Sequence, residues 1–135
     1  MTNAQPPVLG GPCPYLSVDG AAKAADFYVK ALGAKEVMRM PPDDKGRHLH
    51  IHLVINGGSL MLADAFPEHG HPLEKPAGFT LHLAVDDVDA AFNHAIKAGA
   101  EVVLPVQDMF WGDRYGQFRD PFGVLWSMGA PIKKA

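Results

Sequence analysis

Residues 16–32 read LSVDGAAKAADFYVKAL, and residues 83–98 read LAVDDVDAAFNHAIKA. A Gly-Ala pair and then a valine follow each stretch, at residues 33–37 and 99–102. The second copy therefore repeats the first with a single one-residue insertion or deletion between them. A unit that occurs twice predicts two similar half-domains that bury their apolar faces by packing together. The groove between two such halves is where we expect the function to lie.

Each copy belongs to a longer pattern that predicts the order strand, helix and three strands, a βαβββ module. The expected elements are strand 14–18, helix 20–32 and strands 36–40, 48–55 and 59–64, then strand 79–85, helix 87–98 and strands 101–104, 111–119 and 124–128. Helices on only one side of the strands indicate an α+β fold. We expect a flexible N-terminal arm over 1–12, a single domain over 13–130 and a tail over 131–135. Within the domain, module one covers 13–65, a linker covers 66–78 and module two covers 79–130.

Composition limits the classes of function. The chain has 135 residues, of which 47% are hydrophobic and 20% charged, and its net charge is −3. This balance gives no general attraction for nucleic acid or anionic membranes, and no apolar run is long enough to span a bilayer. A single cysteine, Cys13, excludes an intrachain disulfide and is typical of a reducing compartment. We therefore expect a cytoplasmic protein without a nucleic-acid or membrane partner.

Several short motifs, in this order, resemble the vicinal oxygen chelate superfamily, which includes glyoxalase I, extradiol dioxygenases, and fosfomycin- and bleomycin-resistance proteins. The motifs are Pro14-Tyr15-Leu16, Asp26-Phe27-Tyr28, Gly33-Ala34, Leu62-Ala63-Asp64, WGDRYG at 111–116 and DPFG at 120–123. The set as a whole is similar to the PhnB-like branch. The resemblance implies a curved mixed sheet around a groove, a small-molecule ligand and a homodimer.

The resemblance also implies where a metal would bind. Metal-dependent members take four ligands from the first and last strands of each module, and the corresponding positions here are Cys13, Leu62, Thr80 and Ser127. Leucine donates no electron pair, and neutral hydroxyl groups are poor ligands for divalent ions. We therefore expect no metal at these standard positions and no cofactor.

A histidine cluster is the unusual feature of the sequence. His48, His50 and His52 alternate with aliphatic residues, which predicts that the three imidazoles share one sheet face. If the aliphatic residues face the helices, then His50, His52 and His82 face the groove with Tyr15, Ser17 and Asp64. A three-residue loop, Asn56-Gly57-Gly58, is expected to join the two strands of this hairpin and to place His52 on the same face as Leu62.

Three interpretations of the histidines remain open: strand residues hydrogen-bonded to their neighbours, polar anchors for a ligand, or a displaced metal site made of His50, His52 and His82. Four residues are expected either to stack on a planar ligand or to pack in the core or an interface: Trp111, Tyr115, Phe118 and Arg119. The leading hypothesis is a small organic molecule bound in the groove without the standard metal. One alternative is a metal-dependent lyase or isomerase of glyoxalase type with non-standard ligands. Another is a structural dimer whose groove is filled by aromatic side chains.

Overall fold

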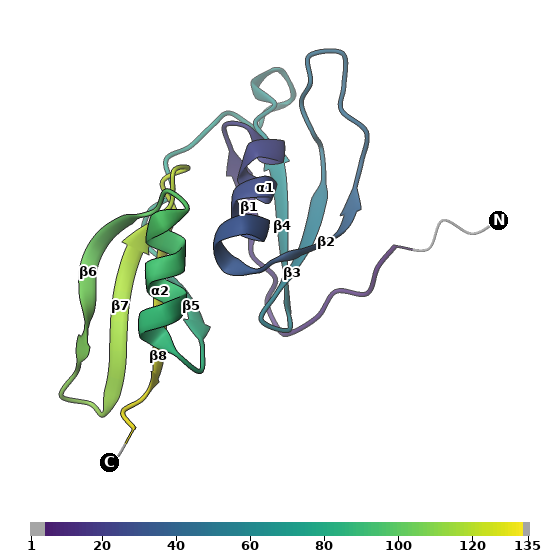
Figure 1. Ribbon diagram of the computed structural model, residues 1–135. Coiled ribbons are helices and arrows are strands. Elements are labelled where there is room, and N and C mark those ends of the chain that lie inside the picture. The colour runs from purple at the N-terminus through teal and green to yellow at the C-terminus, as the bar shows by residue number, and fades with distance from the viewer. Residues whose placement is uncertain (1–4, 134–135) are drawn as a thin grey trace. The chain divides into compact units, whose positions relative to one another are not determined.

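A computed structural model describes residues 5–133 of the chain. The chain divides into two compact units, Met1–Glu74 and Lys75–Ala135. Each unit contains one four-stranded sheet and one α-helix (Figure 1).

The first unit contains β1 (Tyr15–Val18), α1 (Ala21–Leu32), β2 (Lys35–Arg39), β3 (Ile51–Ile55) and β4 (Gly58–Asp64). Its sheet has the order β1-β4-β3-β2. The β1–β4 pair is parallel and the other pairs are antiparallel. A short 3-10 helix, η1 (Pro67–His69), follows within the segment predicted as a linker.

The second unit contains β5 (Leu81–Ala84), α2 (Val88–Lys97), β6 (Glu101–Asp108), β7 (Asp113–Arg119) and β8 (Leu125–Pro131). Its sheet order, β5-β8-β7-β6, repeats the plan of the first unit, again with one parallel pair, β5–β8. The predicted α+β fold of two βαβββ modules is confirmed. The main differences in extent are that β6 and β8 are longer than predicted and that β3 begins at Ile51 rather than at residue 48.

Helix α1 forms because small apolar residues recur at three- and four-residue spacing. Its buried residues are Ala21, Ala24, Ala25, Tyr28 and Ala31. The alanines let the helix lie close against the sheet (Figure 1), where Ile51, Leu53 and Leu62 are fully buried. The helix ends at Gly33, whose φ of 69° is the left-handed conformation that glycine adopts at low cost.

Helix α2 begins at Asp87, whose side chain accepts a hydrogen bond of 3.1 Å from the backbone N–H of Ala90, as the sequence predicts for an N-cap. Phe92 of this helix meets the edge of Phe118 at 5.9 Å between ring centroids. Phe118 in turn stacks on Trp126 at 6.3 Å. These aromatic residues form the core between α2 and the second sheet, and Trp126 is 1% exposed.

The hairpin between β3 and β4 differs from the prediction. Ile55 pairs with Gly58, so the loop has two residues, Asn56 and Gly57, both with positive φ (53° and 82°). Two positive φ values are typical of the type I′ turn, whose twist matches that of the flanking strands. The expected three-residue loop is therefore wrong. His52 pairs with Met61 and shares a face of the sheet with it, whereas Leu62 lies on the other face.

Candidate functional site

Each sheet has one face that its own helix covers, and the opposite face is called here the open face. In the first sheet the register places Tyr15, Ser17, His52, Ser59 and Met61 on the open face. In the second sheet the open face carries His82, Tyr115, Gln117, Arg119, Leu125, Ser127 and Gly129. Polar and aromatic side chains gather on these two faces, whereas the buried residues of the helix-covered faces are mainly apolar.

On the first open face, Tyr15 and His50 are bonded to each other. The Tyr15 hydroxyl lies 2.7 Å from His50 Nδ1 and 3.2 Å from the Leu49 carbonyl oxygen. The hydroxyl has one proton, which goes to the carbonyl when Nδ1 is protonated and to Nδ1 when it is not. Tyr15 is 53% exposed, so the pair is accessible to a ligand. The structure thus brings two of the predicted site residues together.

His52 lies next to His50, with 6.4 Å between the ring centroids, but it is only 1% exposed. Its Nε2 lies 2.7 Å from Ser59 Oγ, which also accepts a hydrogen bond from the Leu9 backbone N–H. Burial, and secondly the positive charge that His50 can carry, lower the pKa of His52. His52 is therefore an internal, neutral imidazole near pH 7.

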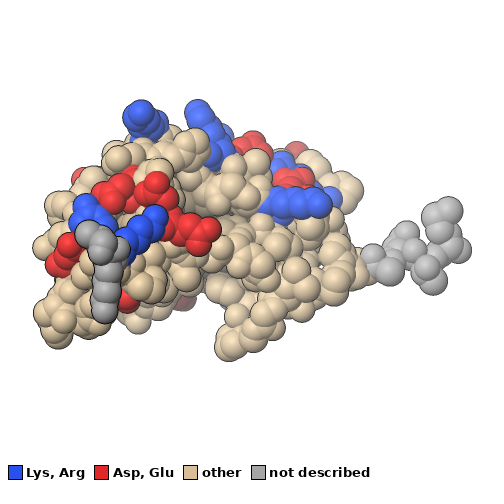
Figure 2. Space-filling model, turned by 60° about the horizontal axis from the view of Figure 1, so that its bottom comes forward, with Lys and Arg blue, Asp and Glu red and all other residues tan. Residues whose placement is uncertain are grey.

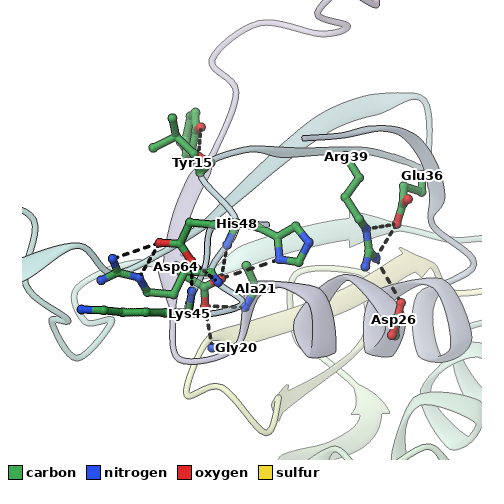
Figure 3. Close-up of polar contacts among 12 residues, drawn as sticks. Tyr15, Gly20, Ala21, Asp26, Glu36, Arg39, Lys45, His48 and Asp64 are labelled. Carbon is green, nitrogen blue, oxygen red and sulfur yellow. Dashed lines mark hydrogen bonds and ion pairs between the residues drawn. The ribbon is translucent and has the colours of Figure 1, made fainter. Parts of the chain in front are cut away.

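Asp64 does not lie on the open face, although the sequence predicts it there with His50 and His52. Leu62 and Asp64 belong to the helix-covered face, because β4 alternates with Met61 on the open face. One carboxylate oxygen of Asp64 accepts hydrogen bonds from Gly20 N (3.0 Å) and Ala21 N (2.9 Å) at the start of α1, and the other accepts one from His48 N (2.7 Å) (Figure 3). Asp64 thus holds a helix start and a loop together.

His48 also departs from the predicted row of three histidines. It precedes β3, is buried, and its Nδ1 lies 4.0 Å from the Asp64 carboxylate rather than beside His52 (Figure 3). The alternation of the sequence therefore becomes a strand only from Ile51 onward. Nδ1 has no hydrogen-bond partner in the described part of the chain.

The two-residue turn also changes one of the standard metal positions. His82 pairs with Ser127 in the second unit, and Tyr15 pairs with Met61 at the equivalent place in the first. Met61, and not Leu62, is therefore the counterpart of Ser127.

Another of the standard metal positions, Cys13, is engaged in the fold. Cys13 donates through its thiol to the Ser59 carbonyl oxygen at 3.5 Å, and burial raises the pKa of that thiol. Within residues 5–133, no three His, Cys, Asp or Glu side chains are grouped so that they could hold a metal ion.

The second open face is built around His82. Its Nδ1 lies 2.7 Å from Ser127 Oγ, and its ring stacks on Tyr115 at 5.9 Å between centroids with 19° between the ring planes. Gly129 lies beneath this pair, and a Cβ atom there would come within 3.0 Å of the His82 ring. Glycine at this position therefore leaves the space that the stacked rings need. His82 is exposed, and its Nε2 has no bonded partner in the described structure.

Two further aromatic residues extend this stack at the β6–β7 loop. Trp111 meets Tyr115 edge-on at 5.5 Å, and Phe110 meets Trp111 at 5.1 Å. Trp111 is 48% exposed and Phe110 96% exposed. Neither side chain is part of the buried core. The core-packing interpretation of Trp111 is therefore not supported within this unit, and Tyr115 is half-buried.

Sequence reasoning missed Gln117, and it considered Arg119 only as a residue that could stack on a planar ligand or pack in the core or an interface. Gln117 donates a hydrogen bond of 3.0 Å to the Tyr115 hydroxyl, and Arg119 follows two residues later on the same strand. Alternation along β7 was the signal that could have identified both residues, since Tyr115, Gln117 and Arg119 are spaced by two. The β7 strand thus presents an aromatic ring, an amide and a cation in a row.

Arg114 has a structural role. It forms a two-point ion pair with Asp89 (2.7 and 2.9 Å) and a third contact with Asp108 (3.0 Å). Basic and acidic side chains lie interspersed on the face shown in Figure 2, which is largely uncharged. No helix in the described part has the length and apolarity needed to cross a membrane.

Comparison with known proteins gives a consistent result. An uncharacterised protein of Mycobacterium bovis is 47% identical over 127 residues, which are 90% of this chain and 83% of that protein. The structure of an antibiotic-binding protein from Streptomyces sp. CB03234 has a TM-score of 0.66 at 29% identity, covering 89% of this chain and 93% of that one. A PhnB protein of Bacillus cereus has a TM-score of 0.68 at 20% identity, covering 88% of this chain and 98% of that one, and so shares the fold.

The family model of the glyoxalase, bleomycin-resistance protein and dioxygenase superfamily matches residues 12–128. This range runs from before β1 into β8, and it includes every motif on which the predicted resemblance rests. The chain therefore belongs to the Glyoxalase/Bleomycin resistance protein/Dioxygenase superfamily.

Proposed function

We propose that this protein binds a small, planar organic molecule on the open face of its second sheet, without a metal ion at the four standard positions. The observation that carries the proposal is the row Trp111–Tyr115–His82, in which exposed and half-buried rings lie edge-on or stacked next to one another. Ligand sites typically combine such apolar and aromatic walls with a few placed polar groups. Tyrosine and tryptophan are also enriched at binding interfaces, where one end of the side chain is apolar and the other polar.

The polar groups of this face are positioned rather than free to move. Ser127 holds Nδ1 of His82, which fixes the ring and leaves Nε2 directed to the ligand. Gln117 holds the Tyr115 hydroxyl by donating to it, so the hydroxyl proton remains available to an acceptor on the ligand. Fixed anchors lower the entropy cost of binding. The arrangement favours a flat ligand with at least one acceptor at its edge.

The comparisons support a binding role. The similar Streptomyces protein is an antibiotic-binding protein, so the superfamily fold serves binding in that chain. The four standard positions in this chain are Cys13, Met61, Thr80 and Ser127, and they offer one thiol, one thioether and two hydroxyl groups. This set is a poor match for a divalent ion that prefers imidazole and carboxylate. The location of the ligand between the two modules, the homodimer and the cytoplasmic setting remain predictions.

A thermal-shift screen of planar aromatic compounds against protein treated with EDTA tests the proposal. A compound that binds only the folded state raises the melting temperature in a concentration-dependent way. We expect His82→Ala and Tyr115→Leu each to weaken such a compound at least about tenfold, since stacking on an aromatic ring contributes about 1–3 kcal/mol. His71→Ala is the control, because His71 lies in the first unit, outside both open faces.

Two results would contradict the proposal. One is a compound that loses no affinity in either second-sheet variant. The other is a shift that disappears after EDTA treatment and returns with added Ni²⁺, Zn²⁺, Mn²⁺ or Fe²⁺, which would favour the metal-dependent lyase or isomerase instead.

A further inference from the structure

One end of the second sheet's open face is hollowed into a pocket of about 390 Å³. The segment 75–79 forms one wall, and Arg119, Gly123 and Leu125 form the other. This volume lies within the range of roughly 300–1,000 Å³ that is typical of small-molecule sites. We call it the end pocket. It lies beyond the aromatic row, on the side of β7 where Arg119 ends the strand.

The end pocket is lined by two cations, Lys75 and Arg119, and by no carboxylate. The Arg119 guanidinium makes one hydrogen bond, of 2.9 Å, to the Gly123 carbonyl oxygen. Within residues 5–133, no ion pair joins Arg119 or Lys75 to an acidic side chain. The other three arginines, in contrast, are each held by two carboxylates: Arg39, Arg47 and Arg114. Among the arginines of residues 5–133, Arg119 is thus the one whose charge no carboxylate compensates by an ion pair.

The neighbouring acidic groups do not neutralise Arg119. Asp120 follows it directly, but its carboxylate is buried and accepts hydrogen bonds from the backbone of Phe122 and Val124 and from the indole N–H of Trp126. Glu101 lies opposite Arg119 in the β6–β7 register and forms no ion pair with it. The remaining donors of the guanidinium are therefore available to an external anion.

We propose that the end pocket binds the carboxylate of an organic acid whose aromatic part stacks on Tyr115 and His82. This inference rests on the proposed function, because it assigns the second end of the same ligand. A planar guanidinium suits a carboxylate because both can form two parallel hydrogen bonds. Phe79 and Leu125 supply apolar walls beside the charge, and Lys75 adds a second donor.

The strand geometry sets the length of the ligand. Tyr115 and Arg119 lie four residues apart on β7, which corresponds to about 13 Å along a strand. The Arg119 guanidinium lies toward the β7–β8 turn, where it donates to the Gly123 carbonyl oxygen, so the ligand has to span most of this distance. The ligand is therefore an aromatic ring joined to a carboxylate through a spacer of several bonds, with Gln117 and Ser127 facing the spacer.

The test compares naphthylbutanoate with its neutral counterpart naphthylbutanamide, titrated into the isotopically labelled full chain and followed by NMR. We expect the acid to bind at least tenfold more tightly than the amide and to shift backbone amides of both the aromatic row and residues 77–79. Arg119→Gln and Lys75→Gln should remove most of that preference. Lys97→Gln is the matched control, because Lys97 is an exposed cation of the same unit at the end of α2, outside the pocket.

Each result decides one of the two proposals. Equal affinity for acid and amide, with shifts at Tyr115, would overturn the end pocket and leave the proposed function standing. Shifts by the acid at residues 77–79 alone, lost in Lys75→Gln, would support the end pocket and contradict the aromatic platform. No shift at residues 77–79 with the acid at about 10 mM, a level that detects even millimolar binding, would overturn the end pocket. Lys75 makes no hydrogen bond in the described structure, so its variant tests the charge without disturbing the Arg119–Gly123 contact.

Discussion

Asp64 shows how a single residue can resemble a ligand-binding group in the sequence and be structural in the fold. Its carboxylate accepts three backbone N–H groups, two from the start of α1 and one from His48 (Figure 3). The helix N-cap position is Gly20, which has no side chain to offer, so the cap comes from a distant strand. The residues around the helix start do not identify this capping residue, because Asp64 lies 43 residues away from Ala21 in the sequence.

Replacement of Asp64 by asparagine should therefore lower the free energy of unfolding. The amide keeps one acceptor oxygen and places an NH₂ group against a backbone donor, so at least one buried N–H loses its partner, at a cost of about 1–3 kcal/mol. Urea denaturation of Asp64→Asn against wild type measures the loss. Asp44→Asn, at an exposed loop position, is the control. Equal stability of both variants would show that the cap is dispensable.

His52 predicts a pH dependence of stability. Burial and the nearby His50 lower its pKa in the folded protein, whereas in the unfolded chain the pKa stays near about 6.5. The unfolded chain therefore takes up the proton first as the pH falls, and the free energy of unfolding decreases below about pH 6.5 until the pH passes the folded pKa.

Urea denaturation at several pH values between about 7.5 and 5 measures this slope. His52→Gln should reduce the acid-side loss, and His71→Gln, at an exposed position, should leave it as in wild type. An identical slope in wild type and His52→Gln would show that another group controls the acid response.

At the scale of elements, the repeat predicts the order of strands and helices but not the register of the first hairpin. The aliphatic alternation of residues 51–55 is compatible with either loop length, and only the turn geometry decides between them. The observed Asn56-Gly57 turn places Ile51 opposite Leu62 and so keeps both on the helix side. One residue of difference in the loop moved Asp64 away from the open face and replaced Leu62 by Met61 at the fourth standard position.

The hairpin itself can be tested with two neighbouring glycines. Gly57 has a φ of 82°, so Gly57→Ala should destabilise the protein by about 1–2 kcal/mol through backbone strain, although no atom lies within 4 Å of the new Cβ. Gly58→Ala is the matched control, because its φ is ordinary and its Cβ would meet the Ile55 carbonyl oxygen at 3.8 Å, a normal contact. Thermal denaturation that finds the two variants equal would contradict the type I′ turn.

The second open face was predictable in part for a similar reason. The sequence identifies Trp111, Tyr115 and His82 as candidate site residues one by one. The pairing of β5 and β7 with β8 then shows that His82 and Tyr115 lie on the same face of the second sheet. Gln117 is an ordinary polar residue in the sequence, and the sequence suggests for Arg119 only stacking or packing, not a place in a pocket. Their roles depend on the pairing of β7 with β8 and on where the segment 75–79 runs, and neither follows from local pattern.

At the scale of the whole molecule, two modules of one plan carry different chemistry on their open faces. The first buries its central histidine, His52, and bonds Tyr15 to His50, whereas the second exposes His82 beside two aromatic rings and ends in a cationic pocket. The two repeated units can differ in this way because the apolar residues that pack against each helix lie on the other face of the sheet. We propose that the second module binds the ligand and that the four standard positions hold no metal.

Metal-independent binding by the second module can be tested with the compound that gives the largest thermal shift, by isothermal titration calorimetry before and after exhaustive EDTA treatment. We expect the same dissociation constant in both samples and an affinity at least about tenfold weaker in His82→Ala, from the loss of one stacked and hydrogen-bonded anchor. Binding that disappears with the metal and returns when a divalent transition metal is restored would contradict metal-independent binding.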